Sequence, residues 1–250
     1  MTIRLTNSQE MSENFYLKVA QGEVAGHSWV HKFGAAPSMT SNTQGTIWDI
    51  NDTVYPWGVF DTPQAITITC DPADNGKTLV LYSLDTNYDI VRENIILNST
   101  TPYVTSATYK RVYRAFMLDE PNVADINFTA ASTVVARISA GNSQTLMAVY
   151  TVPAGYTAYI TQGICSVEAR GDASVDFMVR FYNYDYPGYI VPFRVNHTLE
   201  VTSGSPYQFK PTFPFPIPEK CDLDLRAFVR TNNSRITASF DVLLVKGLLV

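Results

Sequence analysis

Charged side chains are scarce in this chain of 250 residues. Lys, Arg, Asp and Glu together make up 16% of the sequence, whereas an average soluble domain has about 25%. The surface must therefore be built largely from Ser, Thr, Asn, Gln and Tyr, a composition that suits β structure and charge-poor protein interfaces. The net charge is −5 and the cations are scattered. Nucleic-acid binding needs clustered cations, so we expect no nucleic-acid partner.

Cysteine and histidine are also rare, with three of each. The cysteines form no CxxC pair, which indicates buried free thiols rather than a zinc knuckle or a disulfide framework: Cys70, Cys165 and Cys221. His27 and His31 have the spacing of a zinc-binding helix, but Ser28 stands where that motif needs Glu. We expect no metal site.

Long apolar runs and cofactor loops are missing as well. No apolar run reaches ~18 residues, and the first twenty residues lack the apolar core of a signal peptide. We therefore expect no membrane partner and a protein made in a cytoplasm. The sequence has no Walker loop, no GxGxxG and no Gly-x-Ser-x-Gly, so we expect no cofactor and no nucleophilic enzyme.

The dominant pattern from residue 65 onward is alternation of apolar and polar residues, which predicts half-buried strands. The closing segment places every second residue on one apolar face: Ile236, Ala238, Phe240, Val242 and Leu244. Turn signals separate the runs, at 75–76, 140–142, 153–155 and 232–233. Strands at this spacing without a long helix predict an all-β protein of two antiparallel β-sandwich or jelly-roll-like domains.

The expected organisation has three parts. Residues 1–45 have no sustained period and carry aromatic residues, which predicts an irregular N-terminal arm. Residues 46–133 form the first predicted sandwich, and residues 134–250 form the second. We expect the arm to contact a neighbouring subunit through its aromatic residues and one histidine: Phe15, Tyr16, Trp29, His31 and Phe33.

A second predicted interface is the segment "FYNYDYPGYIVPF". Its Tyr184, Tyr186 and Tyr189 surround Pro187 and Gly188, which predicts a projecting loop. Exposed tyrosines can stack on sugars, but they also give protein interfaces large contact areas at low entropic cost. A protein partner is the favoured interpretation, and a glycan remains the alternative.

Glycoside hydrolysis needs only two carboxylates across a cleft, so it is the remaining enzymatic hypothesis. The strand aspartates alternate with the apolar face and are expected to face solvent: Asp176, Asp222, Asp224 and Asp241. Glu93 and Glu168 are the strand glutamates that could act in catalysis. Solvated acids are the simpler interpretation, and we expect no enzyme.

The stretch "TIWDINDTVYPW" at 46–57 is the densest cluster of aromatic and acidic residues. A calcium loop beginning at Asp49 would need Gly at position six and Glu at position twelve, where Val54 and Phe60 stand. Trp48 and Trp57 are instead predicted to be structural anchors of the first sandwich. The turn is predicted to be held by side-chain hydrogen bonds from Asp49, Asn51 and Asp52.

Several phrases together resemble a family of virion structural proteins of tailed bacteriophages, commonly of marine and freshwater bacteria, including cyanobacteria. They are "FYLKVAQGEVAGHSWVHKFG", "IWDINDTVYPW", "QTLMAVYTVPAGYTAYIT", "FPIPEKCDLDLRA" and "FDVLLV". The resemblance spans about residues 14–245. It departs from the family where "WDGGGxYPW" is common and this chain has "WDINDTVYPW".

The resemblance implies a structural component of a bacteriophage particle, made in the host cytoplasm and located in the virion. A capsid decoration or cement protein is favoured, and a tail, fibre or neck component is the alternative. The implied partners are the major capsid protein or other virion proteins, in a homo-oligomer, with a trimer favoured. Glycan-binding receptor and hydrolase remain as competing classes.

Overall fold

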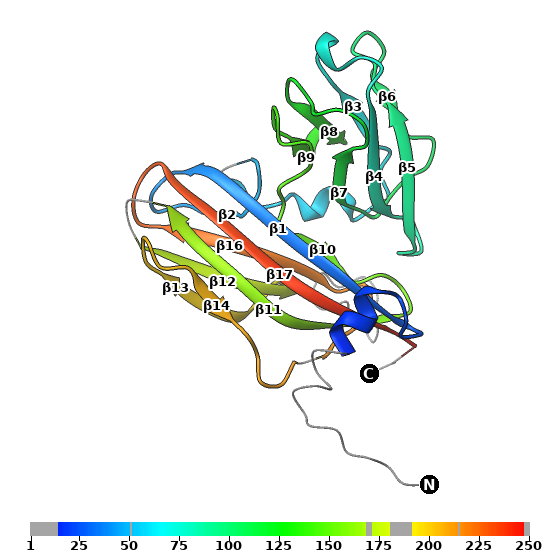
Figure 1. The fold of residues 1–250 in the computed structure, drawn as a ribbon. Helices are drawn as coiled ribbons and strands as arrows, with labels where there is room; N and C mark the ends of the chain where they lie inside the picture. The colour runs from blue at the N-terminus through cyan, green and yellow to red at the C-terminus, as the bar shows by residue number, and fades with distance from the viewer. Residues whose placement is uncertain (1–14, 51, 169–171, 181–191, 215, 248–250) are drawn as a thin grey trace, which may run out of the picture.

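The computed structural model describes residues 15–50, 52–168, 172–180, 192–214 and 216–247. In these residues nearly every element is a β-strand, and every strand pairing is antiparallel. The strands form two sandwiches, a larger one and a smaller one that stands on it (Figure 1). The predicted all-β, antiparallel, sandwich-like fold is confirmed.

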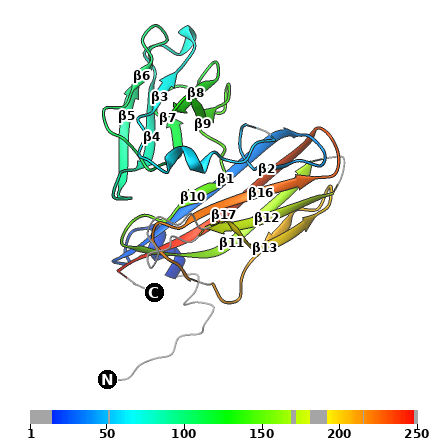
Figure 2. The same cartoon turned by 180° about the vertical axis from the view of Figure 1, so that it is seen from behind.

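The larger sandwich has two five-stranded sheets. The first sheet contains β1 (His27–Met39), β17 (Ser234–Lys246), β11 (Tyr156–Glu168), β14 (Tyr207–Phe209) and β15 (Pro216–Ile217). The second sheet contains β10 (Val149–Thr151), β16 (Asp222–Val229), β12 (Ala173–Arg180), β13 (Arg194–Val201) and β2 (Gln44–Thr46). Figure 2 shows the molecule from the side of this second sheet.

The smaller sandwich is built from the chain between β2 and β10. Its four-stranded sheet contains β6 (Tyr103–Val104), β3 (Thr67–Thr69), β8 (Ile126–Ala130) and β9 (Thr133–Ile138). Its three-stranded sheet contains β5 (Ile90–Ile96), β4 (Thr78–Leu84) and β7 (Arg111–Met117). Two short 3-10 helices accompany them, η1 (Trp57–Phe60) and η2 (Pro72–Asp74).

Each sandwich has its own apolar core. The alternation predicted for β17 is confirmed, because Ile236, Phe240 and Val242 are each at most 1% exposed and belong to the core of the larger sandwich. The core of the smaller sandwich contains Phe60, Ile66 and Phe128. The glycines of three predicted turns have left-handed backbone conformations, with φ of 81°, 76° and 75° at Gly76, Gly141 and Gly155.

The hydrogen-bonded strands group differently from the domain boundaries expected at residues 45 and 133. Residues 27–39 form β1, which pairs along its length with β17, so this part of the expected arm belongs to the larger sandwich. β9 pairs with β8 and therefore belongs to the smaller sandwich. The alternation of "HSWVHKFG" is hard to recognise because Lys32 and Gly34 take the inward positions that apolar residues usually occupy.

β1 approaches the second sheet closely at Gly34. A Cβ atom built on Gly34 would lie 2.1 Å from the Ile47 carbonyl oxygen and 2.5 Å from the Ala148 amide nitrogen. No side chain fits there. Glycine at this position lets β1 pack directly against Ile47 and Ala148, the two points where the chain passes between the larger and the smaller sandwich.

Candidate interaction surface

The outward side of the β1-β17-β11 sheet gathers aromatic and uncharged side chains. Strand register defines this outer face as three successive rows across the sheet: Trp29–Leu243–Tyr159, His31–Asp241–Gln162 and Phe33–Ser239–Ile164. The alternate residues of the same strands face the core of the larger sandwich. These strands run in front of β16 and β12 in Figure 1.

The outer face exposes apolar side chains at both ends of the three rows. Trp29 is 40% exposed and Ile164 is 39% exposed. The ring of Phe33 stacks on His31, with centroids 5.8 Å apart. An exposed Trp, a partly exposed Phe and an exposed Ile on one sheet face are typical of a protein interface.

The polar centre of the outer face is one carboxylate held by two neighbours. Asp241 accepts a hydrogen bond from Nδ1 of His31 at 2.5 Å and another from Nε2 of Gln162. The Asp241 side chain is only 5% exposed, whereas His31 is 49% exposed. The sequence-based expectation that Asp241 faces solvent is wrong, because neighbouring strands supply side chains that cover it. The outer face therefore presents no free carboxylate at its centre.

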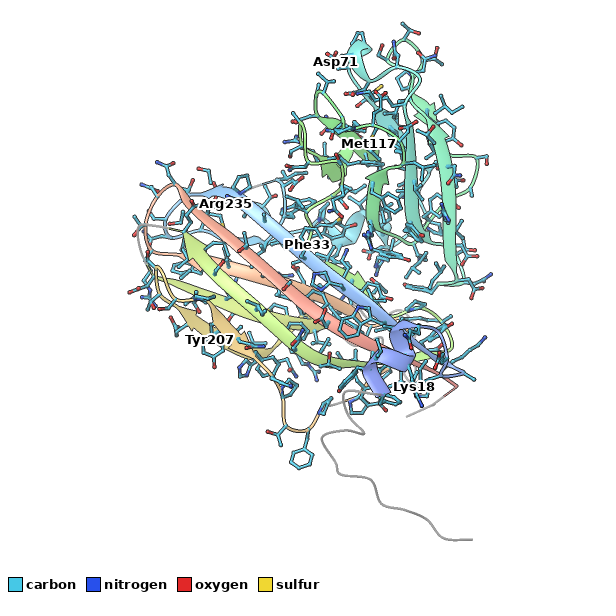
Figure 3. The ribbon with its side chains drawn as sticks, viewed as in Figure 1. Lys18, Phe33, Asp71, Met117, Tyr207 and Arg235 are labelled. Atoms are coloured by element: carbon cyan, nitrogen blue, oxygen red, sulfur yellow. The ribbon has the colours of Figure 1, made fainter. Side chains whose placement is uncertain are left out.

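Charged side chains border the outer face at both ends. At one end Glu168 and Arg235 form an exposed ion pair of 3.4 Å. A surface groove of about 510 Å³ lies beside them, lined also by Ser203 and Gly204. At the other end a helix at residues 15–20 carries Lys18. In Figure 3, Arg235 and Lys18 lie at opposite ends of the sheet with Phe33 between them.

The structure brings the predicted contact residues of the arm to one region. Trp29, His31 and Phe33 lie on the outer face. Phe15 and Tyr16 lie on the helix at 15–20, where the ring of Phe15 is 5.7 Å from that of His27. Tyr184, Tyr186 and Tyr189 lie outside the described residues.

A second polar cluster is buried where the two sandwiches meet. Arg111 of the smaller sandwich binds Asp222 of the larger one through two hydrogen bonds of 2.8 and 2.9 Å. Arg180 donates to the same carboxylate at 2.6 Å. Burial opposes ionisation of Asp222, but Arg111 and Arg180 outweigh it and hold the pKa of Asp222 below its usual value.

The neighbouring Asp224 belongs to the same cluster and is 0% exposed. It accepts hydrogen bonds from Trp57 Nε1 at 3.0 Å, Thr46 Oγ1 at 2.8 Å and Arg226 Nε at 2.8 Å. Burial nevertheless raises the pKa of Asp224. We call this cluster the ionic joint: Trp57, Arg111, Arg180, Asp222, Asp224 and Arg226.

The expectation that Asp222 and Asp224 face solvent is wrong. Both faces of β16 are covered, one by the core of the larger sandwich and the other by residues that reach it from the smaller sandwich, such as Arg111 and Trp57. The alternation "DLDLRA" shows which residues share a face. The alternation does not predict that a distant segment covers the polar face.

The two tryptophans of "TIWDINDTVYPW" are buried beside the ionic joint. Trp48 is 2% exposed and Trp57 is 5% exposed, with Tyr55 packed between them. The guanidinium of Arg111 lies 5.4 Å from the Trp57 ring. Asp49 and Asp52 bind residues outside their turn, Asp49 binding Ser139 and Asp52 binding Thr40.

Lys32 is a further charged residue at the contact between the sandwiches, outside the ionic joint. It is 4% exposed and donates a hydrogen bond to the carbonyl oxygen of Tyr113 on β7. Burial, followed by repulsion from Arg114, lowers the pKa of Lys32 to about 7. No carboxylate within the described residues forms an ion pair with Lys32.

The described residues do not assemble the carboxylate pair that a glycosidase needs from the two strand glutamates. Glu93 lies on β5 of the smaller sandwich, and Glu168 lies on β11 of the larger one. Within the described chain, no group of three His, Cys, Asp or Glu residues could hold a metal ion. Cys165 and Cys221 are buried free thiols, whereas Cys70 is partly exposed.

The helical segments of the described chain are too short or too polar to cross a membrane.

The solved structures similar to this chain include three from one virus. A structure of infectious bursal disease virus strain Gx is 10% identical, covering 88% of this chain and 71% of that chain with a TM-score of 0.28. The T13 particle of the same virus is 10% identical, covering 84% and 56% with a TM-score of 0.28. Its VP2 subviral particle is 10% identical, covering 88% and 72% with a TM-score of 0.26.

All three structures come from virus particles, but scores this low carry no argument about the function of this chain. No protein-family model and no curated protein sequence matches it.

Proposed function

We propose that this protein is a structural component of a bacteriophage particle, a decoration or cement protein that binds the head shell. The observation that supports a role in assembly is the outer face, where Trp29 and Ile164 are exposed and Phe33 is partly exposed around a covered carboxylate. The proposed location in a phage particle rests on the resemblance of the sequence to virion proteins of tailed phages.

The proposed mechanism is multivalent burial of apolar surface. Each copy contributes a modest contact energy, and many copies on one shell together bind with high avidity. The ionic joint supports this role, because it connects the two sandwiches through charges that are fully engaged inside the molecule. The buried carboxylates of Asp222 and Asp224 accept their hydrogen bonds from groups within the protein.

Particle incorporation tests the proposal. Trp29→Ser and Phe33→Ser should each reduce the amount of protein on purified particles, because they remove an exposed and a partly exposed aromatic side chain from the outer face. Val104→Ser, at an exposed apolar residue of the smaller sandwich, is the matched control and should be incorporated normally. Quantitative mass spectrometry of purified particles measures the copy number.

The copy number also separates the proposed location from its alternative. Hundreds of copies per particle support a shell protein, whereas a handful would place the protein in the tail, fibre or neck. Normal incorporation of both outer-face variants would contradict the assignment of the contact surface. If the outer-face variants lost binding to host-cell glycans while they were incorporated normally, the result would support a receptor module.

A further inference from the structure

The smaller sandwich carries a second surface, on which two arginines flank a tyrosine. In the β5-β4-β7 sheet, Tyr82 of β4 pairs with Arg92 of β5 on one side and with Arg114 of β7 on the other. Residues that pair across neighbouring strands share a face of the sheet. The alternate residues of β4, such as Leu81, face the core of the smaller sandwich. We define the arginine face as the outward side of this sheet, which carries Arg92, Tyr82, Arg114 and Phe116.

Both arginines of this face are exposed and lack a counter-charge. No ion pair or side-chain hydrogen bond within the described residues involves the guanidinium of Arg92 or Arg114. Arg194 on β13 also forms no ion pair in that part of the chain, but it lies on the larger sandwich. The other described arginines each pair with a carboxylate: Arg111, Arg137, Arg180, Arg226, Arg230 and Arg235.

The carboxylates closest to the arginine face along the chain bind backbone amides instead. Asp85, in the turn between β4 and β5, accepts hydrogen bonds of 2.8 and 2.9 Å from two amides of its own turn. Asp119 accepts a hydrogen bond of 3.1 Å from the Thr78 amide, at the far end of β4. The charge of Arg114 also opposes protonation of the buried Lys32. The positive charge of the arginine face therefore continues to the contact between the sandwiches.

We propose that the arginine face binds an acidic segment of another protein. A guanidinium group binds a carboxylate through two parallel hydrogen bonds. Arg92 and Arg114 stand on the two strands that flank β4, so their Cα atoms are about 10 Å apart and fit two carboxylates at that spacing. Ile96 and Leu118 follow on the same side of β5 and after β7, and they are 68% and 51% exposed. They offer contacts to apolar side chains of the same segment.

Charge and ring geometry favour a protein over other anionic partners. The chain has a net charge of −5, and two arginines neutralise only about two phosphates, which is too few for strong binding to a nucleic acid. A sugar would need a free aromatic ring on which to stack. The guanidinium of Arg114 already lies 5.4 Å from the centroid of the Phe116 ring, and Tyr82 packs against the core of the larger sandwich.

The size of the arginine face predicts a weak contact with a short segment. β4 has 7 residues, so at about 3.3 Å per residue and about 4.8 Å between strands the three-strand face covers about 330 Å². A standard interface buries about 800 Å² on each partner. We therefore expect a dissociation constant of about 100 μM or higher, and an affinity that falls as salt screens the arginines.

Fluorescence anisotropy with the full-length chain and a labelled peptide of repeated Glu-Glu-Leu-Leu tests the proposal. Arg92→Gln and Arg114→Gln should each weaken binding by about two- to tenfold, because each removes one partner of a carboxylate. Arg194→Gln is the matched control, since it removes an exposed arginine that also lacks a counter-charge. It should leave the affinity unchanged within about twofold. Circular dichroism checks that all three variants fold.

Several results would overturn the proposal. Equal affinity in the native chain and in both arginine-face variants would exclude the face, and so would an equal loss in Arg194→Gln or no binding up to about 1 mM peptide. Tighter binding of a thymidine oligonucleotide or of polygalacturonate would assign the face to a nucleic acid or to an acidic glycan. The proposed function is tested separately, because Trp29→Ser and Phe33→Ser alter the outer face and should bind the peptide as the native chain does.

Discussion

Two buried charged residues at the contact between the sandwiches differ in how they are compensated. Asp222 accepts hydrogen bonds from two arginines and a threonine. Lys32 has a carbonyl oxygen as its acceptor and lies near the positive charge of Arg114. A buried charge that is fully paired is costly to disturb, whereas a buried amine without a counter-charge is itself a cost.

Replacing Lys32 by methionine should stabilise the protein. The pKa of Lys32 is lowered to about 7 in the folded protein, from about 10.4 in an unfolded chain. The protonated amine therefore opposes folding, with the full cost below pH 7 and none above about pH 10.4. Lys32→Met removes this cost but also removes the hydrogen bond to Tyr113. The net effect should be a free energy of unfolding that is higher by about 1–3 kcal/mol at pH 7.

Urea unfolding at pH 7, 8.5 and 10 checks this prediction. The native protein should become more stable across this range as Lys32 loses its proton, while Lys32→Met should lack that increase. Lys18→Met, at an exposed lysine of the helix at 15–20, is the control and should keep the native pH dependence. An equal pH dependence for native protein and Lys32→Met would contradict the burial of a charged amine.

Replacing Asp222 by asparagine should have the opposite effect. The substitution keeps the shape of the side chain but leaves Arg111 and Arg180 without their counter-charge, which typically costs about 3–5 kcal/mol. Glu200→Gln breaks an exposed pair with Arg230 of 3.7 Å and should change stability by less than about 0.5 kcal/mol. Chemical denaturation at pH 7 measures both, and equal effects would show that the ionic joint is not stabilising.

Among the elements, β1 is the strand whose position depends most on one residue. Gly34→Ala would place a methyl group 2.1 Å from the Ile47 carbonyl oxygen, so the backbone must move and we expect a loss of more than about 3 kcal/mol. Gly163→Ala on β11 meets no atom closer than 3.4 Å and should be neutral or stabilising by up to about 1 kcal/mol. Thermal unfolding of both variants provides the comparison, and similar melting temperatures would refute the close approach.

The strands of this protein are predictable where one periodic face meets one core. The run 236–244 shows this, since its apolar residues are buried as expected. β1 was not predicted as a strand, because Lys32 and Gly34 occupy inward positions. The side chain of Lys32 binds Tyr113 on β7, and Gly34 lies against Ile47 and Ala148, which adjoin β2 and β10. The burial of Asp222, Asp224 and Asp241 was missed for the same reason. Their hydrogen-bond partners come from segments distant in the sequence, and the alternation of residues within a strand does not predict such partners.

At the scale of the whole molecule, the two sandwiches should unfold together. The ionic joint and the Lys32–Tyr113 contact connect them, and Tyr113 of the smaller sandwich packs 5.5 Å from Tyr150 of the larger one. Calorimetry of the native protein should therefore show one transition, with equal calorimetric and van't Hoff enthalpies.

The ionic joint provides the variant that tests this coupling. Arg111→Met should separate the transition into two or lower its midpoint, because Asp222 loses the cation that the smaller sandwich supplies. Arg92→Met, at an exposed arginine of β5, should leave a single transition at the native temperature. Two transitions in the native protein would show that the sandwiches unfold independently.

The chain enters and leaves the smaller sandwich at neighbouring points. Trp48 and Met147 form an antiparallel bridge there, and the Ala148 amide donates to the Ile47 carbonyl oxygen at 3.0 Å. Two antiparallel strand ends at this spacing can be closed by a hairpin turn of two residues. The smaller sandwich is thus an insertion between two neighbouring, hydrogen-bonded points of the larger sandwich. A module that replaced it would need to fit these two chain ends and to supply new partners for Lys32 and Asp222, which now bind Tyr113 and Arg111 of the smaller sandwich.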